Sequence, residues 1–383
     1  MKERIWLSLA RMGGHEQAFV QEAFDTNWVV PLGPNVDGFE KDLESFLGED
    51  RQVVALSSGT AALHLGLLLL GVEAGDEVIC QSFTFAASAN PISYLGAKPV
   101  FVDSEADTWN MDPALLEAAI CDRKAKTGKY PKAIIPVHLY GMPTQMEEIM
   151  EVASRYNIPV LEDAAEALGS TLNGQACGTL GDLGVLSFNG NKMITTSGGG
   201  ALICRTKAQA EKAKFYATQA RDQAAHYEHS QIGYNYRMSN ICAGVGRGQM
   251  FILKDNIARR QAIHKQYQQW LTGIPGLQVM DRPSEAFDSN FWLSCLTIDP
   301  EQAGFSREDL RLVLDAQQIE SRPLWKPMHL QPVFAGAPVY ERGVSEQLFE
   351  LGLCLPSGPV LTDADVERVV KTILEFCAVH QGV

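Results

Sequence analysis

Short apolar runs of β-forming residues alternate with helix-like segments over the first two thirds of the chain, and this alternation limits its possible folds most strongly. "VVALSSG" from Val53 leads through a turn into the apolar helical stretch "TAALHLGLLLLG". Further runs are "EVICQSFTF", "AKPVFVDSE", "KAIIPVHLYG", "IPVLEDAAEALGS", "LGVLSFNG" and "GGALICR", with helical segments at 113–126 and 144–156. Near-continuous apolar strands are typical of a mostly parallel sheet buried on both faces. The sequence therefore predicts an α/β fold with its functional residues at strand ends.

The pattern changes after about residue 245. "GQMFILKDNIARRQAIHKQYQQWLTGIPG" has apolar positions at helical spacing, which predicts one long helix leading out of the first unit. "NFWLSCLTI", "SREDLRLVLDAQQ", "ESRPLW" and "TDADVERVVKTILEFCAVH" then predict a small α+β unit, in which Ser306 and Thr362 begin helices. We therefore expect a large domain at 1–245, and a connecting helix with a small C-terminal domain at 246–383.

Charge and cysteine usage exclude several classes of function. The formal net charge is −14 without a basic block, so we expect neither a nucleic-acid partner nor binding to an anionic membrane. The eight cysteines form no CxxC pair, which predicts buried thiols in a reducing compartment. The longest apolar stretch, from Ala61, is far below the ~20 residues of a spanning helix. A cytoplasmic protein is expected, and no metal site, since "HYEH" at 226–229 lacks the HExxH spacing.

One lysine raises a specific question about chemistry. Lys192 lies in "LSFNGNKMITTSGGGA", after a β-like run and before three consecutive glycines. It could clamp a phosphate, form a Schiff base or be an ordinary solvated side chain. A P-loop places its lysine directly after a glycine and before Ser or Thr, whereas Asn191 precedes Lys192 and Met193 follows it. The spacing excludes the P-loop and leaves the other two interpretations to be decided by the rest of the chain.

Three further signals each have a structural and a functional interpretation. Asp163 directly follows an apolar strand, where it could pair with a cofactor ring nitrogen or cap a helix "AAEAL". Gly59 and Thr60 in "SSGTAALHL" place free N–H groups at a helix start, which could bind a phosphate or belong to an ordinary helix cap. Phe85 in "SFTFAAS" could cover an aromatic ring or be a core residue. Together with Lys192 these signals occur in one α/β domain, and they are the set of groups that pyridoxal phosphate (PLP) requires: an anchor, a stacking partner, a counter-ion for the ring nitrogen and an amine.

At the level of whole motifs the chain resembles the PLP-dependent nucleotide-sugar aminotransferases of the DegT/DnrJ/EryC1/StrS family. The matching stretches are "GPNVDGFE", "SSGTAALHL", "SFTFAAS", "EDAAEALGS", "LSFNGNKMITTSGGGA", "GYNYRMSN", "RPLWKPMH" and "CLPSG", which span about residues 30 to 358. The resemblance implies the α/β fold of type I PLP enzymes. "EDAAEALGS", "SFNGNK" and "RPLWKPMH" look most similar to the branch that aminates UDP-2-acetamido-4-keto-2,6-dideoxyglucose in bacillosamine synthesis.

The resemblance implies roles for individual residues around the cofactor. Lys192 matches the Schiff-base lysine of the family, and Asp163 matches the partner of the pyridine nitrogen. Gly59, Thr60 and Ser187 match its phosphate-binding residues.

Further positions concern the ring, the neighbouring subunit and the substrate. Phe85 falls where the family stacks an aromatic side chain, and Asn235 matches an asparagine that reaches the phosphate of the neighbouring subunit, which implies a homodimer with shared sites. Glu166 stands beside the ring where many relatives carry Gln or His, and Asn189 stands where many carry His. Candidate substrate contacts, which could equally be structural residues, are Arg237, Arg322 and His329.

The expected reaction is transfer of the amino group of L-glutamate to C4 of a UDP-4-keto-6-deoxy-N-acetylhexosamine, with PLP as cofactor. Three alternatives remain from the sequence: another UDP- or dTDP-keto sugar, a PLP sugar dehydratase, and a regulator on the same fold. Related dehydratases carry histidine in place of the Schiff-base lysine, so Lys192 argues against the second. The presence of both Lys192 and Asp163 argues against the third.

Overall fold

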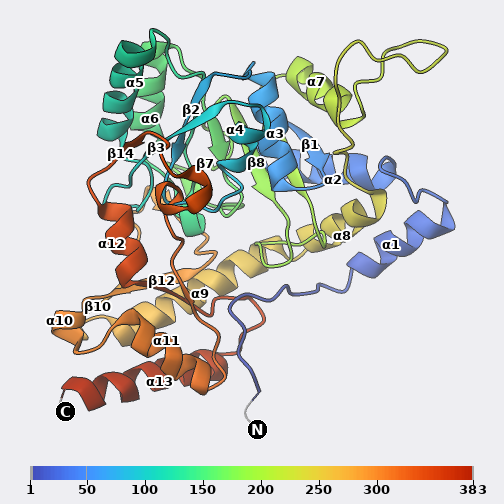
Figure 1. Cartoon of the computed structure of the whole chain (residues 1–383). Helices are drawn as coiled ribbons and strands as arrows, with labels where there is room; N and C mark the ends of the chain where they lie inside the picture. The colour runs from blue at the N-terminus through green and yellow to red at the C-terminus, as the bar shows by residue number, and fades with distance from the viewer. Residues whose placement is uncertain (1–2, 49, 382–383) are drawn as a thin grey trace.

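A mostly parallel sheet forms the centre of the larger unit in the computed structural model, which describes residues 3–48 and 50–381 (Figure 1). One half of the sheet has the strand order β1 (Gln52–Leu56), β9 (Gly200–Cys204), β8 (Leu183–Ser187), β5 (Leu161–Asp163). The other half has the order β14 (Val339–Tyr340), β3 (Lys98–Val102), β2 (Glu77–Gln81), β4 (Ala133–Ile135). Parallel bridges at Ile134–Val160 and Val137–Asp163 join the two halves beside β4 and β5. Only β9 runs against its neighbours among these strands, so the predicted α/β class is confirmed.

Helices cover both faces of this sheet. Successive residues of β1 point to opposite faces: Val54 and Leu56 pack under the helices at 59–69 and 207–217, whereas Val53 and Ala55 pack under those at 34–47 and 240–250. Burial of both faces explains why the strands are apolar at nearly every position. The helices of this unit have these bounds: α1 Glu16–Asp25, α2 Pro34–Leu47, α3 Gly59–Leu69, α4 Asn90–Tyr94, α5 Pro113–Thr127, α6 Met146–Tyr156, α7 Lys207–Ala217 and α8 Asn240–Met250.

The C-terminal unit contains a small antiparallel sheet. Its strand order is β10 (Leu277–Val279), β12 (Ser294–Ile298), β15 (Gly352–Leu355), β13 (Arg322–Pro323). The helices packed with it are α9 (Leu253–Leu271), α10 (Pro300–Ala303), α11 (Arg307–Ala316) and α13 (Asp363–Gln381). Both predicted helix starts are confirmed: Ser306 forms a capping box with Asp309 at the start of α11, and Thr362 and Asp365 make the same reciprocal bonds at the start of α13. The expected α+β unit is present.

Two segments cross the predicted boundary between residues 245 and 246. Ile5, near the N-terminus, pairs with Ile319 and lies in the core of the C-terminal unit. In the opposite direction, Met328 and Phe334 join the core of the large unit, and β14 extends its sheet. The sheet β11 (Phe287–Asp288), β6 (Thr171–Leu172), β7 (Gln175–Ala176) also joins strands from both sides of that boundary. The division at 245/246 stays a prediction, because each unit is completed by residues of the other.

Two local predictions are wrong. The single long helix around residue 250 is two helices, α8 and α9, separated at Phe251 and Ile252. The break lets α8 pack against α1 and α2 while α9 packs against the C-terminal unit. "AAEAL" forms turns instead of a helix.

The cysteine and membrane predictions can also be compared with the structure. All eight cysteines are free thiols, but Cys121 is exposed and Cys242 is half-buried, so the thiols are not uniformly buried as predicted. Within residues 3–48 and 50–381, no helix combines the length and the apolar character needed to cross a bilayer.

Candidate active site

Seven of the predicted site residues line one cavity of about 340 Å³. It lies where β5 and β8 end and α3 begins, which is the ligand position expected for an open α/β sheet. The seven residues come from segments up to 133 positions apart, and they are Gly59, Thr60, Phe85, Asp163, Glu166, Ser187 and Lys192. Asn189 also lines this cavity.

The start of α3 forms one end of the cavity. Ser58 caps the helix by accepting a hydrogen bond from the Ala61 N–H at 3.0 Å. The N–H groups of Gly59 and Thr60 precede the first intrahelical bond, so they can bind an anion. A Cβ atom on Gly200 would lie 2.3 Å from the Gly59 nitrogen. Only glycine therefore fits at this position, where the glycine run ends and β9 begins. The close approach brings Ser187 beside Gly59 and completes a cradle for a phosphate.

Asp163 ends β5 and is held in place by two donors. Ser88 Oγ donates to its Oδ2 at 2.7 Å, and the Ala165 N–H donates to its Oδ1 at 3.1 Å. The helix-cap interpretation is wrong, since turns follow this residue. The carboxylate is 4% exposed, so a ligand nitrogen that pairs with it would do so out of bulk water. Ser88 was not predicted as a site residue, although it lies in the quoted stretch "SFTFAAS".

Lys192 lies on the β8–β9 connection with its amine inside the cavity. Its Nζ is 3.3 Å from Glu166 Oε1 and 4.1 Å from the centre of the Trp292 ring, on whose face it makes a cation–π contact. Glu166 is anchored by the Tyr140 N–H, which donates to Oε2 at 2.7 Å. Burial raises the pKa of Glu166, while the Lys192 charge acts in the opposite direction. The amine is therefore neither freely solvated nor locked in a short ion pair.

A buried arginine, Arg260, holds the segment around Lys192 in place through hydrogen bonds. Arg260 Nη1 donates to the carbonyls of Trp292 at 2.5 Å and Ser357 at 3.1 Å, and its Nη2 reaches Ser8 Oγ at 3.0 Å. No carboxylate within the described ranges pairs with this guanidinium, and burial lowers its pKa to about 9. Ser8 Oγ in turn donates to the Asn191 carbonyl at 2.9 Å. Sequence periodicity alone could not identify Arg260 as important, because this arginine is one of many polar residues on a long helix.

Aromatic side chains form the remaining walls. The Phe85 ring is 55% exposed, and its centre lies 5.5 Å from that of Trp325. The Trp325 ring also stacks against the Tyr140 ring, and the two ring centres are 6.1 Å apart. Phe85 is thus a surface aromatic that faces a cavity, which argues against the core interpretation. Trp292 and Trp325 were not predicted, although Trp325 lies in the quoted stretch "RPLWKPMH".

Four predicted residues do not line this cavity. Asn235 is exposed and pairs with Thr218 in an antiparallel bridge. The Arg237 guanidinium donates to Glu40 and to the Ala55 carbonyl, so it is engaged inside the fold.

The other two lie in the C-terminal unit. Arg322 is exposed on β13 and pairs with Glu320 at 2.8 Å. His329 contacts Ser82, Glu341 and Glu346. The cavity in this chain therefore gives no support to the substrate contacts predicted for Arg237, Arg322 and His329.

The donor set fits PLP. Lys192 would supply the amine that the aldehyde of PLP requires, Asp163 would pair with the ring nitrogen, and Gly59, Thr60 and Ser187 would bind the phosphate. When bound, PLP supplies an electron-withdrawing ring that stabilises negative charge at the carbon of an attached amine. The Lys192 amine can then take a proton from that carbon, since an amine beside a cavity is a suitable general base.

Known proteins with the same sequence pattern support this assignment. A model of the DegT/DnrJ/EryC1/StrS aminotransferase family matches residues 10–374. The chain is 48% identical over 380 residues to EpsN of Bacillus subtilis (strain 168), whose name describes a pyridoxal phosphate-dependent aminotransferase; the match covers 98% of this chain and 96% of EpsN. It is 38% identical over 372 residues to a GDP-perosamine synthase of Caulobacter vibrioides, with 97% of each chain covered.

A solved structure supports the same conclusion. The PLP form of Spr1654 from Streptococcus pneumoniae, whose title describes a sugar aminotransferase, matches with a TM-score of 0.88 at 26% identity, covering 98% of this chain and 99% of that one. Fold, cavity and family model therefore agree on the cofactor and the reaction class. The chain belongs to the DegT/DnrJ/EryC1/StrS aminotransferase family and is a PLP-dependent aminotransferase of nucleotide sugars.

Proposed function

We propose that the chain transfers the amino group of L-glutamate to C4 of a UDP-4-keto-6-deoxy-N-acetylhexosamine. The product is UDP-2-acetamido-4-amino-2,4,6-trideoxyglucose, a precursor for bacillosamine-type glycans or glycoproteins. The observation that carries this proposal is that no histidine is among the described residues lining the cavity. Glu166 and Asn189 occupy the two positions where many relatives carry an imidazole, and both face the cavity. The branch that the chain resembles, which acts on acetamido sugars, shares these two replacements.

Carboxyl and amide groups beside the reacting centre suit an acetamido sugar. An acetamido substituent presents one N–H donor and one carbonyl acceptor, and Asn189 offers the complementary pair on a single side chain. Glu166 adds an acceptor that is already fixed by the Tyr140 N–H. A site built to hydrogen-bond a substituent discriminates against a substrate that lacks it, because a buried polar group such as Glu166 would then lose a partner.

Four residues of the cavity have a defined task in this proposal. Lys192 moves a proton between the α-carbon of the amino acid and the cofactor. Asp163, oriented by Ser88, keeps the ring nitrogen protonated. Trp292 lies under the Lys192 amine and limits where it can move. The same residues serve the reverse steps at C4 of the sugar.

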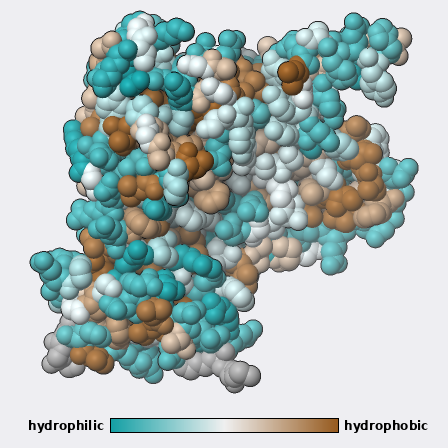
Figure 2. Space-filling model, viewed as in Figure 1, coloured by the Kyte–Doolittle hydropathy of each residue, from teal (hydrophilic) through white to brown (hydrophobic). Residues whose placement is uncertain are grey.

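We further infer that the site is completed in a homodimer. Lys192 is the one lysine or arginine among the described lining residues, and it cannot also neutralise a nucleotide diphosphate. The segment between α7 and α8, residues 218–239, projects from the body of the molecule (Figure 1), and its residue Asn235 is exposed. Exposed apolar side chains gather at α1 and the turn after it (Figure 2), and they are Phe24, Trp28, Val29, Val30 and Leu32. Burial of such a patch against a second copy would form a homodimer, and we propose that Asn235 then reaches the partner's cavity.

We place the enzyme in the cytoplasm. Its eight cysteines are all unpaired, and free thiols persist in a reducing compartment.

The deciding experiment presents purified enzyme and L-glutamate with UDP-, dTDP- and GDP-linked 4-keto sugars, with and without the 2-acetamido group. Products are identified by mass and by NMR, and Lys192→Ala serves as the blank. The proposal predicts the highest kcat/KM for the UDP acetamido sugar. A higher value for a GDP- or dTDP-linked sugar would overturn the substrate assignment and leave the family assignment intact. Borohydride reduction followed by peptide mapping should find the cofactor on Lys192, and sedimentation should find a dimer.

A further inference from the structure

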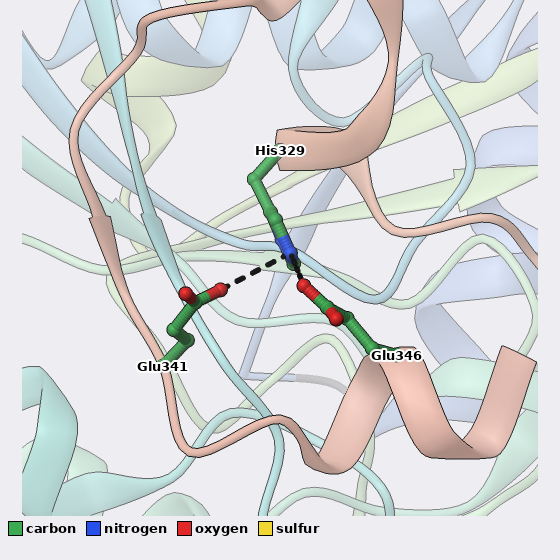
Figure 3. A group of neighbouring side chains, drawn as sticks. All are labelled: His329, Glu341 and Glu346. Atoms are coloured by element: carbon green, nitrogen blue, oxygen red, sulfur yellow. Dashed lines mark hydrogen bonds and ion pairs between the residues drawn. The ribbon is translucent and has the colours of Figure 1, made fainter.

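A second group of functional side chains lies outside the cavity. His329 on the short helix η2 (Met328–Leu330), Glu341 just after β14, and Glu346 on α12 (Val344–Leu351) point toward one another (Figure 3). Nε2 of His329 is 3.0 Å from Glu346 Oε1 and 3.3 Å from Glu341 Oε2. One ligand atom from each of the three residues lies within 4.8 Å of the others. No step of the transamination uses this group.

The charges in this group do not balance. Two carboxylates face one imidazole, so one negative charge would remain even if the imidazole were protonated. Among residues 3–48 and 50–381, no lysine or arginine forms an ion pair with Glu341 or Glu346. Arg342, next to Glu341 in the sequence, is paired with Asp112 instead. A divalent cation would supply the missing positive charge.

The imidazole is oriented as a metal ligand would be. Its Nδ1 lies 2.6 Å from Ser82 Oγ, which leaves Nε2 directed at the carboxylates. An oriented imidazole whose second nitrogen is hydrogen-bonded is the usual arrangement in metal sites. Two tetrahedral ligands at about 2.1 Å from one Zn²⁺ lie roughly 3.4 Å apart. The separations of 3.0 and 3.3 Å are close to that value, so an ion could enter with small side-chain shifts.

We propose that His329, Glu341 and Glu346 bind one Zn²⁺ ion, with water in the fourth position. The histidine side chain is 7% exposed and the two carboxylates are 44% and 43% exposed, so an ion can reach the oxygens from solvent and then meet a fixed nitrogen. One imidazole with two carboxylates is a ligand set that Zn²⁺ accepts.

The position of the site defines its task. Ser82 precedes the Phe85 segment of the cavity wall by three residues, and the Met328 N–H donates to the Ser82 carbonyl at 2.7 Å. His329 follows Trp325, the aromatic residue opposite Phe85, by four residues. The ion would therefore fasten together the two segments that carry the Phe85–Trp325 wall. Its role is structural, since no group of the site lines the cavity.

The test uses tag-free, PLP-loaded enzyme after chelator dialysis, titrated calorimetrically with ZnCl₂. We expect one saturable Zn²⁺ per chain, and a higher thermal midpoint in its presence, because a ligand that binds the native state stabilises it. The variant Glu341→Gln/Glu346→Gln keeps side-chain size and hydrogen bonding but removes both charges. Its zinc affinity should fall at least about 100-fold, more than the loss of an outer-shell partner causes. Its midpoint should no longer respond to zinc.

The matched control is Glu228→Gln. Glu228 faces His226 at 3.3 Å on the surface, with one carboxylate and one imidazole, and no third ligand in the described part of the chain. This variant should bind zinc as the wild type does. Absence of saturable binding in the wild type would overturn the proposal. Equal affinity in the double variant would also overturn it, because the zinc would then be on other groups, such as the exposed thiol of Cys121.

Discussion

The cavity around Lys192 and the ion-pair cluster around Arg237 both place a cation against a buried carboxylate, but their surroundings differ. Arg237 donates to Glu40 and to the Ala55 carbonyl, and Glu40 also accepts from Lys214 at 2.8 Å and from the Ala55 N–H at 2.8 Å. Each charged group there has its hydrogen-bond partners within the protein. The Lys192 amine has one carboxylate at 3.3 Å and an aromatic face, with a cavity on its open side.

The difference shows what separates a functional charge from a structural one. A buried charge with all its partners in the protein gains nothing from a ligand, whereas one that faces a cavity with incomplete partners can bind or react. The two residues look similar in the sequence, since each is a single cation among polar and aromatic residues, in "SFNGNK" and "GYNYR". The contrast predicts that substitutions near Lys192 act on the reaction and substitutions near Arg237 act on stability.

The largest expected effect is that of Lys192→Ala. Turnover should fall at least about 10⁴-fold, because the substitution removes the amine that we propose attaches the cofactor and moves the proton. PLP should still bind, since the cradle of Gly59, Thr60 and Ser187 does not depend on the lysine. The measurements are 2-oxoglutarate release from glutamate and the cofactor content by mass after gel filtration. Residual turnover within a hundredfold of the wild type would contradict the claim that Lys192 is a functional charge.

Arg237→Met should destabilise the fold by about 2 kcal/mol, because it removes one of the two cations paired with the buried Glu40 carboxylate and leaves Lys214 as the other. KM for the nucleotide sugar should stay unchanged. Chemical unfolding at matched protein and cofactor concentrations measures the first quantity, and steady-state kinetics measure the second. Arg322→Ala is the control, because that side chain is 65% exposed and its loss should change stability by less than about 0.5 kcal/mol. Unchanged stability with a raised KM would assign Arg237 to the substrate instead.

Asp163→Ala should lower the rate of the glutamate half-reaction at least about tenfold at saturating cofactor, because the ring nitrogen loses its ion pair. Ser88→Ala should act in the same direction but less strongly, since it only releases one oxygen of that carboxylate. Single-turnover kinetics with glutamate distinguish the two variants. A wild-type rate in Asp163→Ala would show that Asp163 has only a structural role and does not act on the ring nitrogen.

The smallest effect concerns Glu166→Gln in the protein without cofactor. Burial raises the folded-state pKa of Glu166 above its ordinary value of 4.5. The unfolded chain therefore ionises first as pH rises above 4.5, and stability is lost from there up through the folded-state pKa. Glu166→Gln should be at least as stable as the wild type at pH 7, and this difference should disappear below pH 4.5. Unfolding curves across that range test the sign, and a variant that is less stable only at neutral pH would contradict it.

Residues that end a strand or start a helix could be placed from the sequence. The strand-end position of Asp163 and the cap at Ser58 follow from patterns within a few neighbouring residues. Ser88 could not be recognised as the partner of Asp163, because 75 residues separate them. The aromatic wall formed by Trp325 was missed for the same reason, since it depends on a C-terminal segment returning to the large unit.

The sequence by itself determined the alternation of strands and helices, the sheet they form, and the set of groups that suits PLP. Those features depend on periodicity and on short motifs, which act between residues two to four positions apart. Only the tertiary structure decided that Lys192 faces a cavity while Arg237 is matched by Glu40, 197 residues away. It also decided that Arg260 supports the Lys192 segment and that the helix near residue 250 breaks in two. Such choices depend on which distant segments pack together, because a charge acquires its final partners only when the whole chain has folded around it.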